Sequence, residues 1–255
     1  MKTSENTLLI TGGGSGIGRA LAESFHQRGN KVIIAGRRRA VLEETTRANP
    51  GMAAVTLDIE SSEAIRSFAE NLTRDFPSLN GVIHNAGIMK SEDLLAQAGD
   101  VSIAEATIAT NLLGPIRLNA ALLPHLQKQS RATIITVSSG LAFVPMFPTP
   151  TYCATKAAIH SYTQSLRFQL RRTAVEVIEL VPPYVQTELM GQRQASDPQA
   201  MPLREFISEV MQLLETEPTP KEILVGRVKP LRFAEKNGDY AAFYEKFNQA
   251  MASHR

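Results

Sequence analysis

The chain has one cysteine, no tryptophan and no long apolar run, and these absences exclude several classes of protein. The single thiol, Cys153, cannot form a disulfide or a thiolate metal cluster within one chain, which agrees with a reducing compartment. No apolar run is long enough to span a bilayer, and residues 1–6 lack the apolar stretch of a secretory signal. We therefore expect a cytoplasmic protein without a membrane partner.

Excess charge and metal-ligand patterns are missing as well. The formal net charge is only +2, which is too small to indicate nucleic acid as the main partner. The five histidines show no ligand spacing and no neighbouring cysteine or acidic cluster in the sequence, so we expect no metal site. They are His26, His84, His125, His160 and His254. In contrast, 43% of the 255 residues are apolar, which is enough for a packed core.

A glycine-rich turn is the most informative stretch that is present. The apolar run Leu8-Leu9-Ile10 precedes T-G-G-G-S-G-I-G at residues 11–18, and a helical pattern follows over 19–28. A strand, a glycine turn and a helix start in this order suit a dinucleotide. Glycines let the backbone approach a pyrophosphate, and the helix N-terminus offers free N–H groups. The predicted cofactor contacts are Gly12, Gly14, Ser15, Gly16, Ile17 and Gly18.

Short β-rich runs alternate with patterns of helical length along the chain. The predicted strands are Thr7–Thr11, Lys31–Ala35, Ala53–Leu57, Gly81–His84, Thr133–Ser138, Val175–Val181 and, more weakly, Glu222–Val225. This alternation predicts a parallel sheet with helices on both faces, either doubly wound or closed into a barrel. The glycine turn after the first strand favours a Rossmann-type doubly wound sheet. We predict a single α/β domain over residues 1–255, with a substrate loop and helix at about 187–216 and a C-terminal extension at about 226–255.

The end of the second predicted strand bears on the choice of cofactor. A carboxylate there would bind the ribose 2′-hydroxyl of NAD, whereas an arginine would bind the 2′-phosphate of NADP. Gly36 leaves no acid and Arg37 supplies the cation, with Arg38 beside it as a further contact, so the sequence favours NADP. NAD stays possible if the arginines face solvent. At the third strand end we expect Asp58 and Ile59 on the adenine side, with Asp58 also able to cap the next helix.

Candidate catalytic groups follow the fifth predicted strand. Tyr152 and Lys156 stand four residues apart near the start of a helical pattern that runs to about Arg172, so they share one helix face. A nearby lysine cation favours the phenolate and would lower the tyrosine pKa, which suits a general acid or base. Ser139, at the strand end, could hold a carbonyl oxygen. Asn111 lies inside the helical pattern of 103–126, where asparagine is unfavourable, and it predicts a kink or a specific hydrogen bond.

These motifs together resemble the short-chain dehydrogenase/reductase (SDR) family over residues 6 to about 190. The matching features are the glycine turn, Asn85-Ala86-Gly87, Asn111, Ser139 and the Tyr152–Lys156 pair. The resemblance implies that Tyr152 protonates a carbonyl oxygen, that Ser139 orients it, and that Asn111 holds a water relaying protons towards Lys156. It also implies that Lys156 binds the nicotinamide ribose and depresses the tyrosine pKa.

The resemblance extends to a segment that would hold the nicotinamide, and it includes departures. Residues 182–187 resemble the family's P-G-x-x-x-T segment, which implies cofactor contacts from Pro182, the Val185 backbone and the Thr187 hydroxyl. His84 stands where the family usually has asparagine, which we expect to perturb a strand contact, and Pro183 replaces a glycine. The ending at residues 223–228 resembles a bacterial subgroup of DltE-like oxidoreductases.

The resemblance implies an NADP-dependent oxidoreductase acting on a small carbonyl compound or secondary alcohol, and a homodimer or homotetramer. The alternatives are NAD preference, a nucleotide-binding regulator without turnover, and a barrel hydrolase. The hydrolase is disfavoured because the sequence shows no nucleophile elbow. Apolar residues near the expected chemistry suggest an apolar or aromatic substrate: Phe143, Met146, Phe147, Tyr184, Leu189 and Met190. An aromatic stripe in the tail either packs on its own domain or meets a partner subunit: Tyr240, Phe243, Tyr244, Phe247 and Met251.

Overall fold

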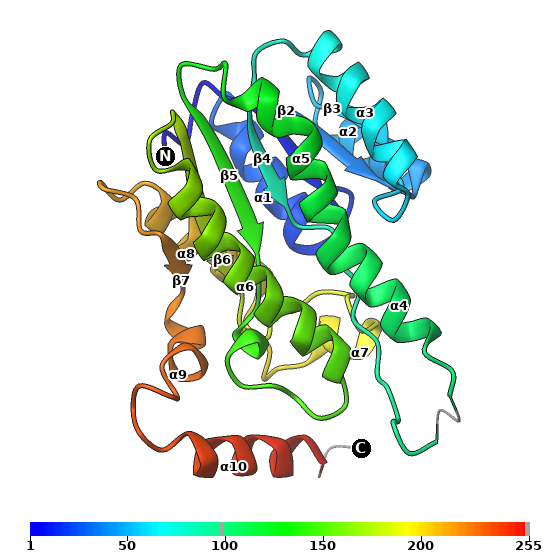
Figure 1. Cartoon of the computed structure of the whole chain (residues 1–255), viewed down its shortest axis with the longest axis vertical. Helices are drawn as coiled ribbons and strands as arrows, with labels where there is room; N and C mark the ends of the chain where they lie inside the picture. Colours follow the sequence, from blue (N-terminus) through cyan, green and yellow to red (C-terminus); the bar gives the residue numbers. More distant parts are fainter. Residues whose placement is uncertain (97–98, 253–255) are drawn as a thin grey trace.

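Seven parallel strands form one sheet in the computed structural model, which describes residues 1–96 and 99–252 (Figure 1). The order across the sheet is β3-β2-β1-β4-β5-β6-β7, the doubly wound arrangement with one additional strand. The strands are β1 (Thr7–Thr11), β2 (Lys31–Gly36), β3 (Ala53–Thr56), β4 (Leu79–His84), β5 (Ala132–Val137), β6 (Val175–Val181) and β7 (Glu222–Leu224). All seven predicted strands are confirmed; two have the predicted boundaries, and the boundaries of the other five shift by at most two residues.

Helices cover both faces of this sheet. The main ones are α1 (Gly16–Gln27), α2 (Arg39–Ala48), α3 (Ser62–Asp75), α4 (Ser102–Ile108), α5 (Gly114–Leu126), α6 (Pro150–Leu170), α7 (Gln192–Ser196), α8 (Leu203–Leu214), α9 (Lys229–Arg232) and α10 (Tyr240–Ala252). Buried side chains of α1, α2 and α8 form a core with one face of the sheet, and those of α3, α5 and α6 do so with the other. None of the helices in the described ranges is both long and apolar enough to cross a membrane.

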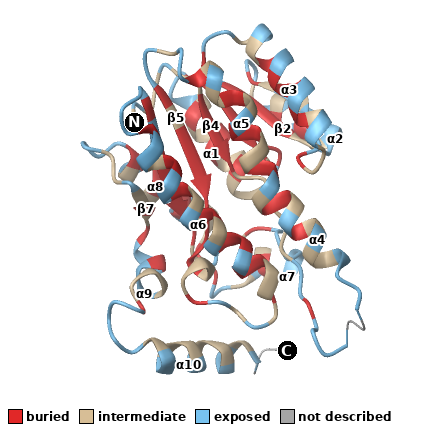
Figure 2. Cartoon of the chain, in the orientation of Figure 1, coloured by how far each residue is buried: buried red, intermediate tan, exposed pale blue. Residues whose placement is uncertain are grey.

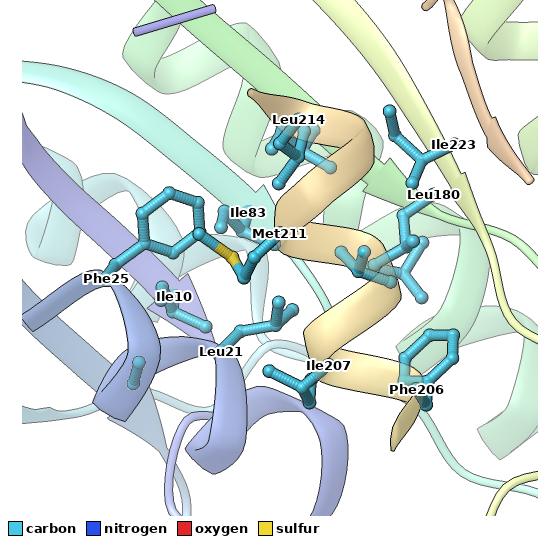
Figure 3. Packing of buried hydrophobic residues seen from close by; sticks show 14 of the residues in the cluster. Ile10, Leu21, Phe25, Ile83, Leu180, Phe206, Ile207, Met211, Leu214 and Ile223 are labelled. Atoms are coloured by element: carbon cyan, nitrogen blue, oxygen red, sulfur yellow. The ribbon is translucent and has the colours of Figure 1, made fainter. Parts of the chain in front are cut away.

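Helix α8 belongs to the core. Its apolar face, including Phe206, Val210 and Leu214, is buried against α1 and the sheet. Figure 3 shows Ile207 and Met211 of α8 directed towards Leu21 and Phe25 of α1, whereas Phe206 projects from the opposite side of the helix. This face of α8 therefore closes the hydrophobic core.

The predicted helical stretch 103–126 is interrupted. Between α4 and α5, residues Ala109–Leu113 form a single π-helical turn, and Asn111 is buried within it. Insertions of this kind are often found at functional sites, because the extra residue redirects one side chain. The kink predicted at Asn111 is thus present as a π-turn.

Crossovers from the central strands leave the sheet in opposite directions between β1 and β4. In an open parallel sheet, this reversal opens a crevice outside the carboxyl ends of the strands, where ligands bind. The glycine turn after β1, residues 85–87 after β4 and Ser139 after β5 all follow strand ends at this edge. The topology therefore places these predicted site residues along one edge of the sheet.

The C-terminal segment lies apart from this core. Helix α10 has no buried residue and runs below α9 and the start of α6 (Figures 1 and 2). The aromatic rings of its predicted stripe pair along the helix, Tyr240 with Tyr244 and Phe243 with Phe247. Asn248 joins α10 to the body, since it accepts the Phe147 N–H at 2.7 Å and donates to the Pro145 carbonyl at 3.1 Å.

Candidate active site

The glycine turn has the backbone conformation that a dinucleotide requires. Gly12 and Gly16 have φ angles of +67° and +52°, in the left-handed region that favours glycine. A Cβ atom on Gly12 would lie 2.9 Å from Asn85 Nδ2, so a side chain there would clash. A Cβ atom on Gly16 would face Thr187 Cγ2 at 3.5 Å, which brings the two predicted cofactor segments together. The residues present therefore fit a bound pyrophosphate at the start of α1.

Asn85 and Thr11 hold this turn against the end of β4. Asn85 Nδ2 donates to the Thr11 carbonyl at 3.1 Å and to the Gly12 carbonyl at 3.4 Å. The Thr11 hydroxyl in turn accepts the backbone N–H groups of Asn85 and Ala86, both at 3.1 Å. The predicted Asn85-Ala86-Gly87 segment thus fixes the conformation of the glycine turn.

The three arginines after β2 have different partners. Arg37 pairs with Glu60 at 2.8 Å, and Arg39 pairs with Glu43 at 2.6 Å. Arg38 instead donates to the Ser15 hydroxyl in the glycine turn at 3.1 Å, and it contacts no carboxylate in the described part of the chain. Arg38 is therefore the cation that an anion beside the glycine turn would meet with least competition.

Asp58 and Ile59 lie at the end of β3 as expected, but Asp58 does not cap α3. Its carboxylate accepts the Glu60 N–H at 3.1 Å, whereas the cap of α3 is Ser61, whose hydroxyl accepts the Ala64 N–H at 3.1 Å. Ile59 is buried. The expected cap is wrong because serine stands one residue before the helix begins, where a short side chain reaches the free N–H groups.

Ser139, Tyr152 and Lys156 converge at the end of β5. The Ser139 hydroxyl lies near the Tyr152 phenol, where it counteracts the rise in the pKa of that phenol, and both side chains are buried. The Lys156 ammonium lies 5.5 Å from the centre of the Tyr152 ring and donates to the Val137 carbonyl at 2.8 Å. Ser139 also caps the 3-10 turn Gly140–Ala142 by accepting the Leu141 N–H. One strand end and one helix start therefore hold the three groups together.

Burial is the largest influence on the pKa values of Tyr152 and Lys156. It raises the pKa of the Tyr152 phenol well above its usual value, although the hydrogen bond from Ser139 opposes the shift. Burial also lowers the pKa of the Lys156 ammonium to about 8. The lowering of the tyrosine pKa expected from Lys156 is therefore wrong for this structure, because desolvation of the phenolate outweighs the nearby cation.

Asn111 ties the π-turn to the segment after β4. Its Oδ1 accepts the Ile88 N–H and its Nδ2 donates to the Ile88 carbonyl, both at 2.9 Å. Its Nδ2 also donates to the Thr155 hydroxyl at 3.3 Å, one residue before Lys156. The structure thus places Asn111 beside the helix face of the predicted catalytic groups, with most of its amide used in structural bonds.

Pro182, Val185 and Thr187 lie after β6, opposite the glycine turn. The Pro182 carbonyl accepts the Gly140 N–H at 2.9 Å, which links this segment to the turn that follows Ser139. Gln194 Nε2 donates hydrogen bonds to the Val185 carbonyl at 2.8 Å and to the Thr187 hydroxyl oxygen at 3.1 Å. Gln194 was not predicted, because only the folded loop brings it to these two atoms.

Glu92 is a second residue that the sequence did not reveal. It is 8% exposed, and its carboxylate accepts the Thr151 N–H at 3.0 Å and the Thr151 hydroxyl at 2.8 Å. Helix α6 has no side-chain cap of its own, so Glu92 satisfies a free N–H group one residue before Tyr152. An acidic residue 59 positions away gives no local signal of such a role.

A buried polar group supports the strand that ends at Ser139. Glu179 of β6 is fully buried, accepts the Ser138 hydroxyl at 2.5 Å and pairs with His160 at 2.8 Å. Glu222 lies near them, so His160 does have acidic neighbours in space. Glu222 is already paired with Arg232 at 2.6 Å, which leaves this cluster internally satisfied. We therefore still expect no metal there.

The residues expected to line a substrate pocket divide into two groups. The Phe143 ring packs against His160, with ring centres 4.7 Å apart, and under Arg232, so it belongs to the support of the β5 end. Of the others, Met146 is half-buried, and Phe147, Tyr184, Leu189 and Met190 are 39–46% exposed.

Comparison with known proteins agrees with this geometry. Residues 6–198 match the family model described as short chain dehydrogenase. The chain is 39% identical to the uncharacterized oxidoreductase DltE of Bacillus subtilis, over 97% of this chain and 98% of that protein. A short-chain dehydrogenase of Burkholderia cenocepacia in complex with NADP has a TM-score of 0.81 and 25% identity, over 96% of this chain and 98% of that one. A Burkholderia phymatum member in complex with NAD has a TM-score of 0.81 and 19% identity, over 94% and 96%. The chain therefore belongs to the short-chain dehydrogenase family and is an oxidoreductase.

Proposed function

We propose that this protein is an NADP(H)-dependent oxidoreductase that interconverts a carbonyl compound and a secondary alcohol. The observation that carries the proposal is the meeting of Ser139, Tyr152 and Lys156 at the carboxyl edge of the sheet. When bound, the nicotinamide cofactor supplies or accepts the hydride. The protein residues supply binding, orientation and the proton.

In the direction of reduction, Tyr152 donates its phenol proton to the carbonyl oxygen of the substrate. The raised pKa of this phenol keeps the proton in place until negative charge develops on that oxygen. Ser139 orients the same oxygen by a hydrogen bond. A protonated Lys156, held by the Val137 carbonyl, stabilises the phenolate that forms. In the direction of oxidation, the phenolate takes the proton from the alcohol.

The preference for NADP rests on the arginines after β2. Related structures hold NAD in one case and NADP in another, so the fold alone does not choose. Arg38 beside Ser15 supports a 2′-phosphate, and no carboxylate stands at Gly36. The apolar side chains at residues 147, 184, 189 and 190 support an apolar or aromatic substrate. From the family we also infer a homodimer or homotetramer, and from the single cysteine a cytoplasmic location.

The test is turnover of a panel of carbonyl compounds, followed by NADPH absorbance, with wild type, Tyr152→Phe and Tyr162→Phe. Positioned general acids typically contribute about 10²- to 10⁴-fold, so Tyr152→Phe should lose at least about a hundredfold in kcat. Tyr162, on the same helix, is hydrogen-bonded to Asn119 and serves as the matched control with little expected loss. Turnover that persists in Tyr152→Phe would contradict the assignment. Tight NADPH binding without turnover of any compound in wild type would favour a nucleotide-binding regulator.

A further inference from the structure

The loop that carries Val185 and Thr187 closes on itself. Val185 and Met201 form a parallel bridge, and the flanking bonds are Gln186 N–H to the Met201 carbonyl at 2.9 Å and Met201 N–H to the Tyr184 carbonyl at 2.8 Å. These bonds fix the two ends of the segment 185–201. Inside the segment, Gln186 Nε2 donates to the Asp197 carbonyl at 3.0 Å, and the Gln194 side chain bonds to Val185, Thr187 and Met190.

Gln194, on α7, uses both ends of its amide inside this loop. It is 7% exposed; Nε2 donates to the Val185 carbonyl at 2.8 Å and to the Thr187 hydroxyl at 3.1 Å. Its Oε1 accepts the Met190 N–H at 3.0 Å. A backbone carbonyl can only accept and a backbone N–H can only donate, so these two partners fix which end of the amide is which.

This orientation determines the polarity of Thr187. Because Nε2 is the donor, the Thr187 oxygen acts as an acceptor towards Gln194 and its one hydrogen stays available. Within the described residues, the Thr187 hydroxyl donates to no protein acceptor. Its side chain faces Gly16 of the glycine turn. The hydrogen is therefore available to an acceptor oxygen on the cofactor side of the loop.

We propose that Gln194 is a positioning residue for the cofactor, which presents the Thr187 hydroxyl as a hydrogen-bond donor to an oxygen atom of a bound nicotinamide dinucleotide. The inference rests on the proposed function, since it requires that the crevice binds this cofactor. A positioning role differs from a general contribution of Gln194 to folding stability, because positioning acts on cofactor binding through the Thr187 hydroxyl. A side chain of the same shape without the amide would leave the Val185 carbonyl unpaired and Thr187 unoriented.

The test is a double-mutant cycle on the Kd of NADP⁺, measured by isothermal titration calorimetry, so that no substrate is needed. Gln194→Met and Thr187→Val should each weaken binding by about five- to tenfold, the range for losing a hydrogen bond within a buried group. The double variant should be no weaker than the weaker single variant, because both remove the same donor. Gln192→Met is the matched control, since Gln192 lies on the same helix and is exposed, and its side-chain amide donates to Glu188 and not to the cofactor segment.

Each outcome separates the inference from the proposed function. If wild type binds neither NADP⁺ nor NAD⁺, the proposed function fails. If wild type binds NADP⁺ and Gln194→Met binds it equally well, or the two single effects multiply in the double variant, the inference is overturned. Should Gln194→Met not fold, Gln194→Glu replaces it, because a carboxylate cannot donate to Thr187 and should show the same loss at pH 8.

Discussion

Replacing Arg38 by alanine should remove the preference for NADP over NAD. Arg38 reaches Ser15 in the glycine turn, whereas the charge of Arg37 is already matched by Glu60. The 2′-phosphate of NADP is the only part of the cofactor that NAD lacks. A cation that contacts this phosphate therefore acts on one cofactor and leaves the other unaffected.

The size of the effect follows from the exposure of Arg38. Two unit charges about 4 Å apart interact by about 1 kcal/mol in water and by about 4 kcal/mol at an effective dielectric constant of 20. Arg38 is exposed, so the lower part of this range applies. We expect Arg38→Ala to cost about 1.5 to 2 kcal/mol, which is about a 10- to 30-fold rise in the Kd of NADPH. The Kd of NADH should stay within about twofold.

The assay is fluorescence titration of NADPH and NADH against wild type, Arg38→Ala and Arg39→Ala. Arg39→Ala removes the same unit of charge from the next position, but Arg39 is paired with Glu43 and should leave both affinities unchanged. The ratio of the NADH Kd to the NADPH Kd in wild type should decrease as the salt concentration is raised, because salt screens the interaction between exposed charges. Equal weakening of NADPH and NADH by Arg38→Ala, or an equal effect of Arg39→Ala, would refute the reasoning.

Two further predictions concern stability and assembly. Burial lowers the pKa of His84 to about 4 from about 6.5, so the unfolded chain binds more protons between these values and stability rises with pH across this window. The free energy of unfolding should fall by about 3 kcal/mol as pH falls from about 6.5 to about 4. Urea unfolding of His84→Gln should show a flatter dependence of this free energy on pH. The same pH dependence in wild type and His84→Gln would show that His84 is not its source. Deleting residues 238–255 should leave the fold intact, because no residue of α10 is buried, and should reduce the oligomer seen by gel filtration if the aromatic stripe meets a partner. An unchanged oligomer would remove the stripe from the interface.

The local sequence was sufficient to predict those features that depend on the residues of one short segment. The strands, the glycine turn and the start of α6 each follow from composition and spacing over a few residues, and Asn111 marked the π-turn because asparagine disfavours a regular helix. His84, at the end of β4, is buried, and its Nε2 lies 2.7 Å from Asn119 Oδ1, a contact that the sequence pattern did not identify.

The sequence could not reveal contacts that depend on tertiary proximity. Glu92 and Glu179 are separated in the chain from the groups they hold by 59 and 41 residues. The pKa of Tyr152 was predicted with the wrong sign because spacing shows the neighbouring lysine but not the extent of burial. The sequence also could not show which arginine is left to bind a 2′-phosphate. Arg37 is paired with Glu60, and the two meet because β2 pairs with β3.

The π-turn at Ala109–Leu113 has a consequence for insertions and deletions. Deleting one residue there would let α4 and α5 join as one regular helix, with better backbone geometry. The same deletion would turn everything on one side of it by about 100° relative to the other, and Asn111 would swing away from Ile88. A deletion that improves the helix would therefore displace Asn111 from the site, so the number of residues in this turn should be fixed.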